Sequence, residues 1–278
     1  MLLSLAPMEG ITGYAFRRVH AEVFSALDRY YTPFISPLPK VGTPFSKRNS
    51  RELDPANNQG LNVVPQLLTN DADRFIWAAG LLADVCERSP LPVSVKTRVG
   101  IANDDEYDEL LALFCRCGIA ELIVHPRVQK DFYDGAPRQE LYGKTLERAP
   151  FPIAYNGDIF TLDDFNTLVA AYPQTRHVMI GRGIVTNPAL ARMIRGGAGL
   201  AREELERFHN ELYQAYTDDM GGNAVFRMKE WWSYAERSFA DPSSVHRIMR
   251  KTRRANEYEA AARKIFSTEK LADSPRFT

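Results

Sequence analysis

Short apolar runs that end in polar residues recur at nearly constant spacing through the first two thirds of the chain. From Gln66 onward these polar ends fall at residues 66, 96, 125, 156 and 181, close to the ~30 residues of one βα unit. Segments of helical period, such as 71–88, 105–117 and 162–171, lie between most of the runs. This order predicts a parallel sheet. Its strands are expected at residues 3–8, 30–35, 62–67, 92–98, 121–127, 153–158 and 177–182.

The predicted fold class is α/β, with a TIM-type (β/α) barrel that has seven strands where eight are usual. After Asn187-Pro188 the pattern changes. The run 196–199 is typical of a hinge, and residues 202–266 are helical in period throughout. We therefore expect a barrel domain over residues 1–195 and a small all-helical domain over residues 196–278.

Composition narrows the functional classes. No run of the 278 residues approaches the ~20 apolar residues of a membrane span, and the first residues lack the basic leader of a signal peptide. The three cysteines (Cys86, Cys115 and Cys117) form neither a disulfide framework nor a four-ligand metal site. We expect a cytoplasmic monomer without a metal or a membrane partner.

Two strand ends carry glycine beside polar residues: Asn156-Gly157-Asp158 and Gly181-Arg182-Gly183. The last strands of a (β/α) barrel commonly build a phosphate site, glycine admits a ligand close to the main chain, and arginine suits a phosphate. The alternative is two core strands that end in ordinary loop glycines.

Further polar residues end the other strands: Gln66, Lys96, Arg98, His125 and Arg127. Several polar groups that converge on one barrel mouth indicate a bound ligand, because each lies at the edge of an apolar core. The Lys96 ammonium can lie beside an electron-rich ring or a phosphate. His125 can bind the same ligand or be a satisfied core residue.

Six segments, in order, resemble those of the tRNA-dihydrouridine synthases, flavoenzymes that reduce selected uridines in tRNA. The similarity runs over roughly residues 5–190, and a loop at 129–133 is also similar. The six segments are residues 6–12 (APMEGIT), 65–67 (PQL), 95–98 (VKTR), 125–127 (HPR), 156–158 (NGD) and 181–183 (GRG).

The resemblance implies FMN across the barrel mouth, with NADPH as the reductant and hydride delivered to C6 of the uracil. It places the main chain of Pro7 and Met8 beside the flavin ring, Gln66 and Lys96 on the polar edge of the ring, and His125 near ring and phosphate. The ribityl chain and phosphate would be held by Asn156, Gly157, Asp158, Gly181 and Arg182, and substrate by Arg98 and Arg127.

One departure from the family bears on activity. Family members carry, between the glutamine and lysine strands, another strand that ends in an Asn-x-Gly-Cys-Pro loop, whose cysteine gives a proton to C5 of the uracil. Here residues 69–92 form one expected helix, which contains Cys86, and no such loop. No proton donor can be named, and we expect impaired turnover. The barrel should either close more tightly or keep two unpaired edges beside Gln66 and Lys96.

The helical region carries the nucleic-acid prediction. Residues 227–254 contain eight basic and three acidic residues, interleaved with Trp231, Trp232 and Tyr234. Such a stripe suits RNA backbone and base stacking. The equal alternative is a solvated helix face whose tryptophans fill a core. From this stripe we expect tRNA contacts at Arg227, Lys229, Arg250 and Arg253.

Three functional hypotheses remain at this stage. The first is an FMN-dependent tRNA-dihydrouridine synthase, impaired in this form. The second is a non-catalytic tRNA-binding protein derived from that family. The third is another FMN barrel oxidoreductase that acts on a small molecule, against which the basic helical region argues.

Overall fold

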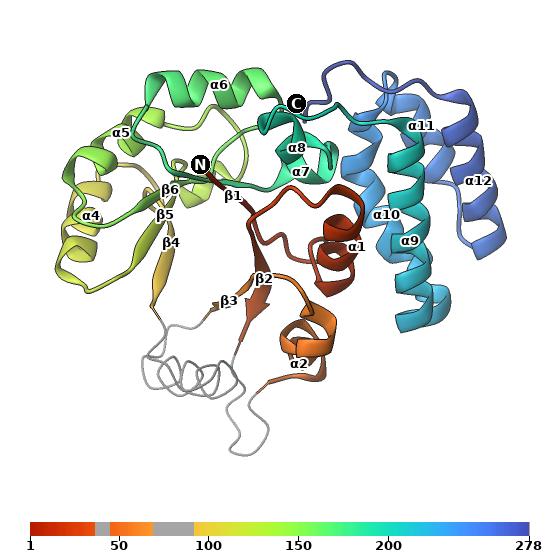
Figure 1. Cartoon of the computed structure of the whole chain (residues 1–278), viewed down its shortest axis with the longest axis horizontal. Coiled ribbons are helices and arrows are strands. Elements are labelled where there is room, and N and C mark those ends of the chain that lie inside the picture. Colours follow the sequence, from red (N-terminus) through yellow and green to blue (C-terminus); the bar gives the residue numbers. More distant parts are fainter. Residues whose placement is uncertain (37–44, 69–91, 278) are drawn as a thin grey trace.

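The computed structural model describes residues 1–36, 45–68 and 92–277. In this part of the chain seven strands form one parallel sheet in the order β3-β2-β1-β7-β6-β5-β4, which curves as an open barrel (Figure 1). The strands are β1 (Leu2–Leu5), β2 (Arg29–Ile35), β3 (Val63–Leu67), β4 (Ser94–Arg98), β5 (Glu121–His125), β6 (Ile153–Tyr155) and β7 (His177–Ile180).

All seven predicted strands are confirmed, although several end earlier than predicted. β6 ends at Tyr155 and β7 at Ile180, so Asn156, Asp158 and Arg182 lie beyond the ladder. These residues leave the sheet because their side chains bond to neighbouring segments.

Within the described residues β3 and β4 each pair on one side only, and together they form the two edges of the sheet. The segment that joins them lies outside the described residues, so the choice between tighter closure and unpaired edges beside Gln66 and Lys96 is made for the described strands alone: they do not close on each other. The helix predicted over residues 71–88, with Cys86, lies outside the described residues.

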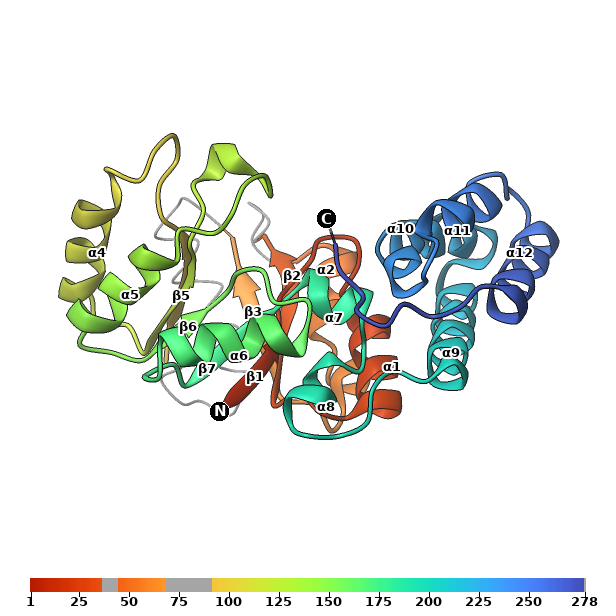
Figure 2. The same cartoon turned by 90° about the horizontal axis from the view of Figure 1, so that it is seen from above.

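Helices surround the sheet, and the predicted helices 105–117 and 162–171 correspond to α4 and α6. Figures 1 and 2 show α4, α5 and α6 over one side of the molecule and α9–α12 grouped beside α1 and α7. The helices of the barrel are α1 (Tyr14–Phe24), α2 (Lys47–Leu53), α4 (Tyr107–Arg116), α5 (Gln139–Arg148), α6 (Leu162–Ala171), α7 (Arg182–Thr186) and α8 (Leu190–Ile194). Those of the helical region are α9 (Arg202–Met220), α10 (Ala224–Ala235), α11 (Pro242–Met249) and α12 (Ala255–Thr268).

Strand alternation divides the sheet into an outer face and an inner face. The inner face packs Ala6, Tyr31, Ile123, Ala154 and Met179 into a small apolar cluster inside the barrel. The outer face joins the helices in the main core.

A closed polar network lies below this cluster, at the amino end of the strands; we call it the barrel floor. The Ser4 hydroxyl lies 2.7 Å from Nε2 of His177, whose Nδ1 lies 2.8 Å from Glu121 Oε1. Arg29 donates to Glu121 Oε2 and to the Tyr31 hydroxyl at 3.5 and 3.4 Å. The floor is therefore polar but internally paired.

The helical region shares its apolar core with the barrel. Phe208 of α9 meets Phe16 of α1 edge to face with ring centroids 5.4 Å apart, and the Tyr216 hydroxyl donates to the Ile11 carbonyl at 3.5 Å. The domain boundary near residue 195 stays a prediction. After α12 the chain returns toward the barrel, so the C-terminus lies near α7 in both views (Figures 1 and 2). None of the helices described has the length and apolar character that a membrane span requires.

Candidate active site at the carboxyl end of the strands

The strand register brings the predicted strand-end residues to one face. Lys96 pairs with Ile123 and Arg98 pairs with His125. Paired residues of parallel strands point to the same side of the sheet, and Ile123 belongs to the inner cluster. Lys96 and His125 therefore face the barrel interior. Gln66 does the same, because it lies two residues after Val64, which packs on the same cluster.

These three side chains at the barrel mouth have no hydrogen-bond partner among the residues that the structure describes. The Gln66 side-chain oxygen is buried and unpaired, while its backbone N–H donates to Thr32 Oγ1 at 3.0 Å. Lys96 and His125 likewise form no side-chain hydrogen bond to any described group. His125 is buried and has the Tyr133 ring 6.2 Å away, centroid to centroid. The Gln66 oxygen is a buried acceptor without a partner among the described residues, and such a group is costly. Its position on the same face as Lys96 and His125 indicates a ligand site.

The charges at the mouth are set by burial. Burial, and then the nearby Arg98 charge, lowers the pKa of Lys96 to about 8. Burial together with the charges of Lys96, Arg98 and Arg127 lowers the pKa of His125 to about 3. At neutral pH the site therefore presents one mostly protonated ammonium beside one neutral imidazole.

At the predicted phosphate end, Asp158 holds two arginines. Arg127 donates to Asp158 Oδ1 and Oδ2 at 3.0 and 2.5 Å, and Arg182 donates to Oδ1 at 2.6 Å. Burial would raise the pKa of Asp158, but the two guanidinium groups hold it below its usual value. A carboxylate repels a phosphate, so the geometry suits Asp158 to positioning the two arginines. Its predicted place at the ribityl chain and phosphate stays a prediction.

The strand-end glycines serve packing within the chain. A Cβ on Gly157 would lie 2.2 Å from the Tyr155 hydroxyl, and one on Gly181 would lie 3.3 Å from the Ala6 Cβ. The Met8 N–H donates to Thr12 Oγ1 at 2.7 Å, which fixes the turn after β1. The Asn156 amide donates to the Met179 carbonyl at 2.8 Å, which ties β6 to β7.

Four of the six residues predicted to contact substrate bond to other groups of the chain, and their contact with substrate stays a prediction. Arg127 is 1% exposed and paired with Asp158. Arg98 donates to the carbonyls of Val128 and Phe132 at 2.9 and 3.0 Å and so holds the loop after β5. The other two are Arg227, which donates to the Gly10 carbonyl and Glu230, and Lys229, which donates to the carbonyls of Arg250 and Thr252.

Arg250 and Arg253 are exposed, together with Arg247, Lys251 and Arg254. These five side chains form a basic cluster over the end of α11 and the start of α12; we call it the α11–α12 cluster. It is the part of the predicted stripe that faces solvent.

Of the two alternatives left open for the tryptophans, base stacking or a core, the structure shows a core. Trp231 and Trp232 are each 1% exposed and pack with Phe208, His209 and Phe266 in the core of the helical region. The Trp232 indole N–H donates to the Tyr258 hydroxyl at 3.0 Å, which lies 2.6 Å from His209 Nε2. The indole N–H of Trp232 is thus satisfied inside the core.

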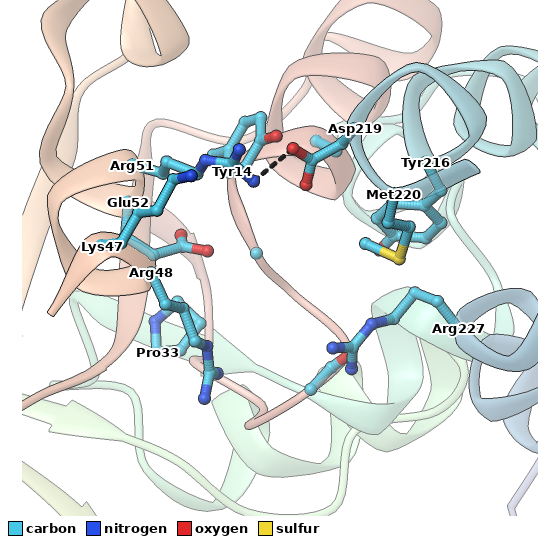
Figure 3. A pocket seen from close by; sticks show the side chains of 13 residues that line it. Tyr14, Pro33, Lys47, Arg48, Arg51, Glu52, Tyr216, Asp219, Met220 and Arg227 are labelled. Atoms are coloured by element: carbon cyan, nitrogen blue, oxygen red, sulfur yellow. Dashed lines mark hydrogen bonds and ion pairs between the residues drawn. The ribbon is translucent and has the colours of Figure 1, made fainter. Parts of the chain in front are cut away.

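A cavity of about 380 Å³ lies beside the mouth, between α1, α2, α9 and α10 (Figure 3). Four cationic side chains line it: Lys47, Arg48, Arg51 and Arg227. Arg51 is paired with Asp219 and Arg48 with Glu9, whereas Lys47 has no ion pair within the described residues. We had not predicted the three basic residues of α2. Their close spacing on one short helix after the Ser46 N-cap would have indicated a basic surface.

The residues at the mouth fit a flavin. An unpaired amide and an ammonium on the inner face suit the polar edge of an isoalloxazine ring, and Arg182 retains guanidinium N–H groups beyond the one that it donates to Asp158. Among the described residues no cluster of three or more His, Cys, Asp or Glu side chains could hold a metal ion.

Comparison with known proteins gives a family and several relatives. The family model described as Dihydrouridine synthase (Dus) matches residues 78–268. The tRNA-dihydrouridine(16) synthase of Shewanella oneidensis is 27% identical over 172 residues, which cover 57% of this chain and 51% of the relative. The corresponding enzyme of Neisseria meningitidis serogroup A is 27% identical over 186 residues, covering 62% and 54%. The chain spans about half the length of the curated relatives it matches.

Among solved structures, a mutant of morphinone reductase in complex with tetrahydroNAD shows 11% identity and a TM-score of 0.46, and covers 74% of this chain and 90% of its own. That similarity is too weak to carry an argument. The family model is stronger evidence than this structural similarity, because it matches residues 78–268, well over half of the 278 residues. The chain belongs to the dihydrouridine synthase family.

Proposed function

We propose that this chain binds FMN at the barrel mouth and acts on uridines of tRNA, with NADPH as the reductant. The observation that carries the proposal is the set of three inner-face side chains, Gln66, Lys96 and His125, that have no partner among the described residues. The names of the relatives support the substrate class, since each is a tRNA-dihydrouridine(16) synthase.

The roles of the residues follow from their chemistry. The Gln66 amide and the Lys96 ammonium bind the polar edge of the ring, and the Lys96 charge stabilises negative charge there. Neutral His125 offers one N–H and one lone pair. Arg182 binds the phosphate through the N–H groups that Asp158 leaves free. When bound, FMN supplies the hydride chemistry.

The nucleic-acid part of the proposal rests on two basic surfaces. The cavity between α1, α2, α9 and α10 is lined by Lys47 and Arg48, and the α11–α12 cluster presents Arg250 and Arg253 to solvent. Both suit a phosphodiester backbone. The cytoplasmic location and the monomeric state stay predictions.

A second candidate function is tRNA binding without catalysis. It is favoured by the absence of an Asn-x-Gly-Cys-Pro run from the sequence. The described cysteines do not replace that run, because Cys115 and Cys117 lie at the end of α4, away from the strand ends.

The test begins with the flavin. Purified chain should show flavin absorbance after incubation with FMN, and Arg182→Ala should weaken FMN binding by roughly 10- to 100-fold, the value of a charged hydrogen bond. Incubation with NADPH and unmodified tRNA, followed by mass spectrometry of the nucleosides, then measures dihydrouridine. FMN binding with a trace of product supports the proposal. FMN binding with no product assigns the second function, and no flavin binding at all rejects the FMN site.

A further inference from the structure

Three aromatic rings surround the guanidinium of Arg182. The Arg182 Cζ lies 4.3 Å from the centroid of Tyr133, 5.3 Å from that of Phe160 and 5.2 Å from that of Phe277. Tyr133 follows β5 and Phe160 follows β6, so two rings come from the barrel. The third belongs to the C-terminal segment, more than 90 residues further along the chain.

The C-terminal segment is docked at several points. The Ala272 N–H donates to the Ser238 carbonyl at 2.9 Å, and Pro275 is buried. Arg276 pairs with Asp164 of α6 at 2.6 Å. These contacts carry the chain from the helical region back onto the barrel.

The Phe277 ring is also held from the side of the helical region. It stacks on Tyr234 of α10 with centroids 5.4 Å apart and planes at 27°, and the Arg237 guanidinium lies 5.3 Å from its centroid. Phe277 is therefore placed by the helical region and contacts an arginine of the barrel.

The orientation of that arginine matters for its chemistry. A guanidinium is a planar fork whose N–H bonds lie in its plane, so it binds a phosphate through two N–H groups only when an edge of that plane points at the anion. Asp158 restrains one nitrogen of Arg182, and the aromatic rings beside the guanidinium restrain its plane.

We propose that Phe277 is a positioning residue for Arg182, so that the helical region sets the affinity of the barrel for the phosphate of FMN. This inference rests on the proposed FMN site. Phe277 does not contact the phosphate. It fixes the orientation of the Arg182 guanidinium, whose N–H groups contact the phosphate.

The test compares FMN with riboflavin, which lacks the phosphate, by quenching of flavin fluorescence. Phe277→Ala should weaken FMN binding about 3- to 10-fold and leave riboflavin binding unchanged. Phe277→Leu should behave like Phe277→Ala, because it keeps apolar bulk without a ring face. Phe277→Trp should restore the wild-type affinity. Phe226→Ala serves as the matched control, since this exposed α10 phenylalanine is not one of the three rings around Arg182.

Three results would overturn the inference while leaving the proposed function intact: FMN affinity of Phe277→Ala equal to wild type, equal loss of FMN and riboflavin, or full affinity in Phe277→Leu. A wild-type chain that binds neither flavin rejects the proposed FMN site and this inference together.

Discussion

The two ends of the barrel interior handle polar side chains in opposite ways. At the floor, Ser4, His177 and Glu121 form a chain of hydrogen bonds at 2.7 and 2.8 Å. At the mouth, Gln66 and His125 are inner-face groups of the same sheet with no partner among the described residues. Both ends are polar, but only one is internally satisfied.

The paired floor serves the stability of the fold, and the unpaired mouth serves ligand binding. The order Ser4–His177–Glu121 has the chemical types of a hydrolase triad, yet Ser4 is fully buried and no substrate reaches it. Its hydrogen bonds stabilise the fold. At the mouth the unpaired groups cost stability, and they are explained by a ligand that pairs them. Exposed chemistry at the carboxyl end and closed packing at the amino end is the general pattern of (β/α) barrels.

The largest effect we expect concerns turnover at the mouth. Positioned general acids contribute about 10²–10⁴-fold, and this chain lacks the Asn-x-Gly-Cys-Pro loop. Dihydrouridine formation should be slower than that of an intact relative by about this factor. Inserting a strand, that loop and a helix between Thr69 and Pro92 should raise the rate. Rapid turnover that survives mutation of all three cysteines would show that another group supplies the proton.

The next effect should appear at the floor. His177→Ala removes both of its hydrogen bonds, which leaves the Ser4 hydroxyl without a partner in this network and Glu121 with Arg29 alone. The free energy of unfolding should fall by about 3 kcal/mol. Urea denaturation measures this change, and FMN affinity should remain at the wild-type value. His246→Ala, whose exposed ring pairs with the buried Glu236, is the control and should cost less than His177→Ala, because only one hydrogen bond to an exposed ring is lost. If His177→Ala lost FMN binding and kept its stability, the floor and not the mouth would be the ligand site.

A pH dependence should mark the mouth. Because the pKa of Lys96 is lowered to about 8, the ammonium loses its proton as pH rises above that value, and FMN affinity should fall by up to about tenfold per pH unit. Between pH 7 and 8 it should change little, since the FMN phosphate is already ionised above about pH 6 and His125, with a pKa near 3, stays neutral. Lys96→Gln should bind more weakly and show no such fall. An unchanged decline in that variant would assign the titration to another group.

The smallest effect concerns the α11–α12 cluster. Arg250→Glu together with Arg253→Glu should weaken tRNA binding several-fold. The slope of log K against log salt concentration should become less steep by roughly 0.7–0.9 for each lost phosphate contact. Filter binding at several salt concentrations measures the slope, and FMN content should not change. Reversing Arg263 and Lys264, exposed on α12, changes the charge equally away from the cluster. Equal loss in both variants would reduce the effect to net charge.

Much of the barrel could be predicted from the sequence. The regularly spaced apolar runs and their polar ends located the seven strands. The register of the observed strands then places Gln66, Lys96 and His125 on one face. The pattern failed at strand ends, where Asn156 bonds to Met179 within β7 and Asp158 bonds to arginines that follow β5 and β7. Local sequence does not contain those partners.

The roles of individual charges could not be predicted for the same reason. Arg127 looks like a free strand-end cation until Asp158, which is 31 residues away, takes its guanidinium. Trp231 and Trp232 fit a basic stripe and a buried core equally well by composition, and only the packing of α9 against α10 decides between them. No local sequence pattern predicts the contact between Phe277 and Arg182.

The central claim is that the mouth keeps polar groups unpaired for a ligand, and Gln66→Leu tests it most directly. The free energy of unfolding of wild type and variant is measured by urea denaturation with and without excess FMN. Without FMN the variant should be more stable by about 1 kcal/mol, because a buried unpaired oxygen is removed; with FMN it should gain clearly less stabilisation than wild type. A variant that is less stable without FMN, or that gains as much from FMN as wild type, would contradict the account.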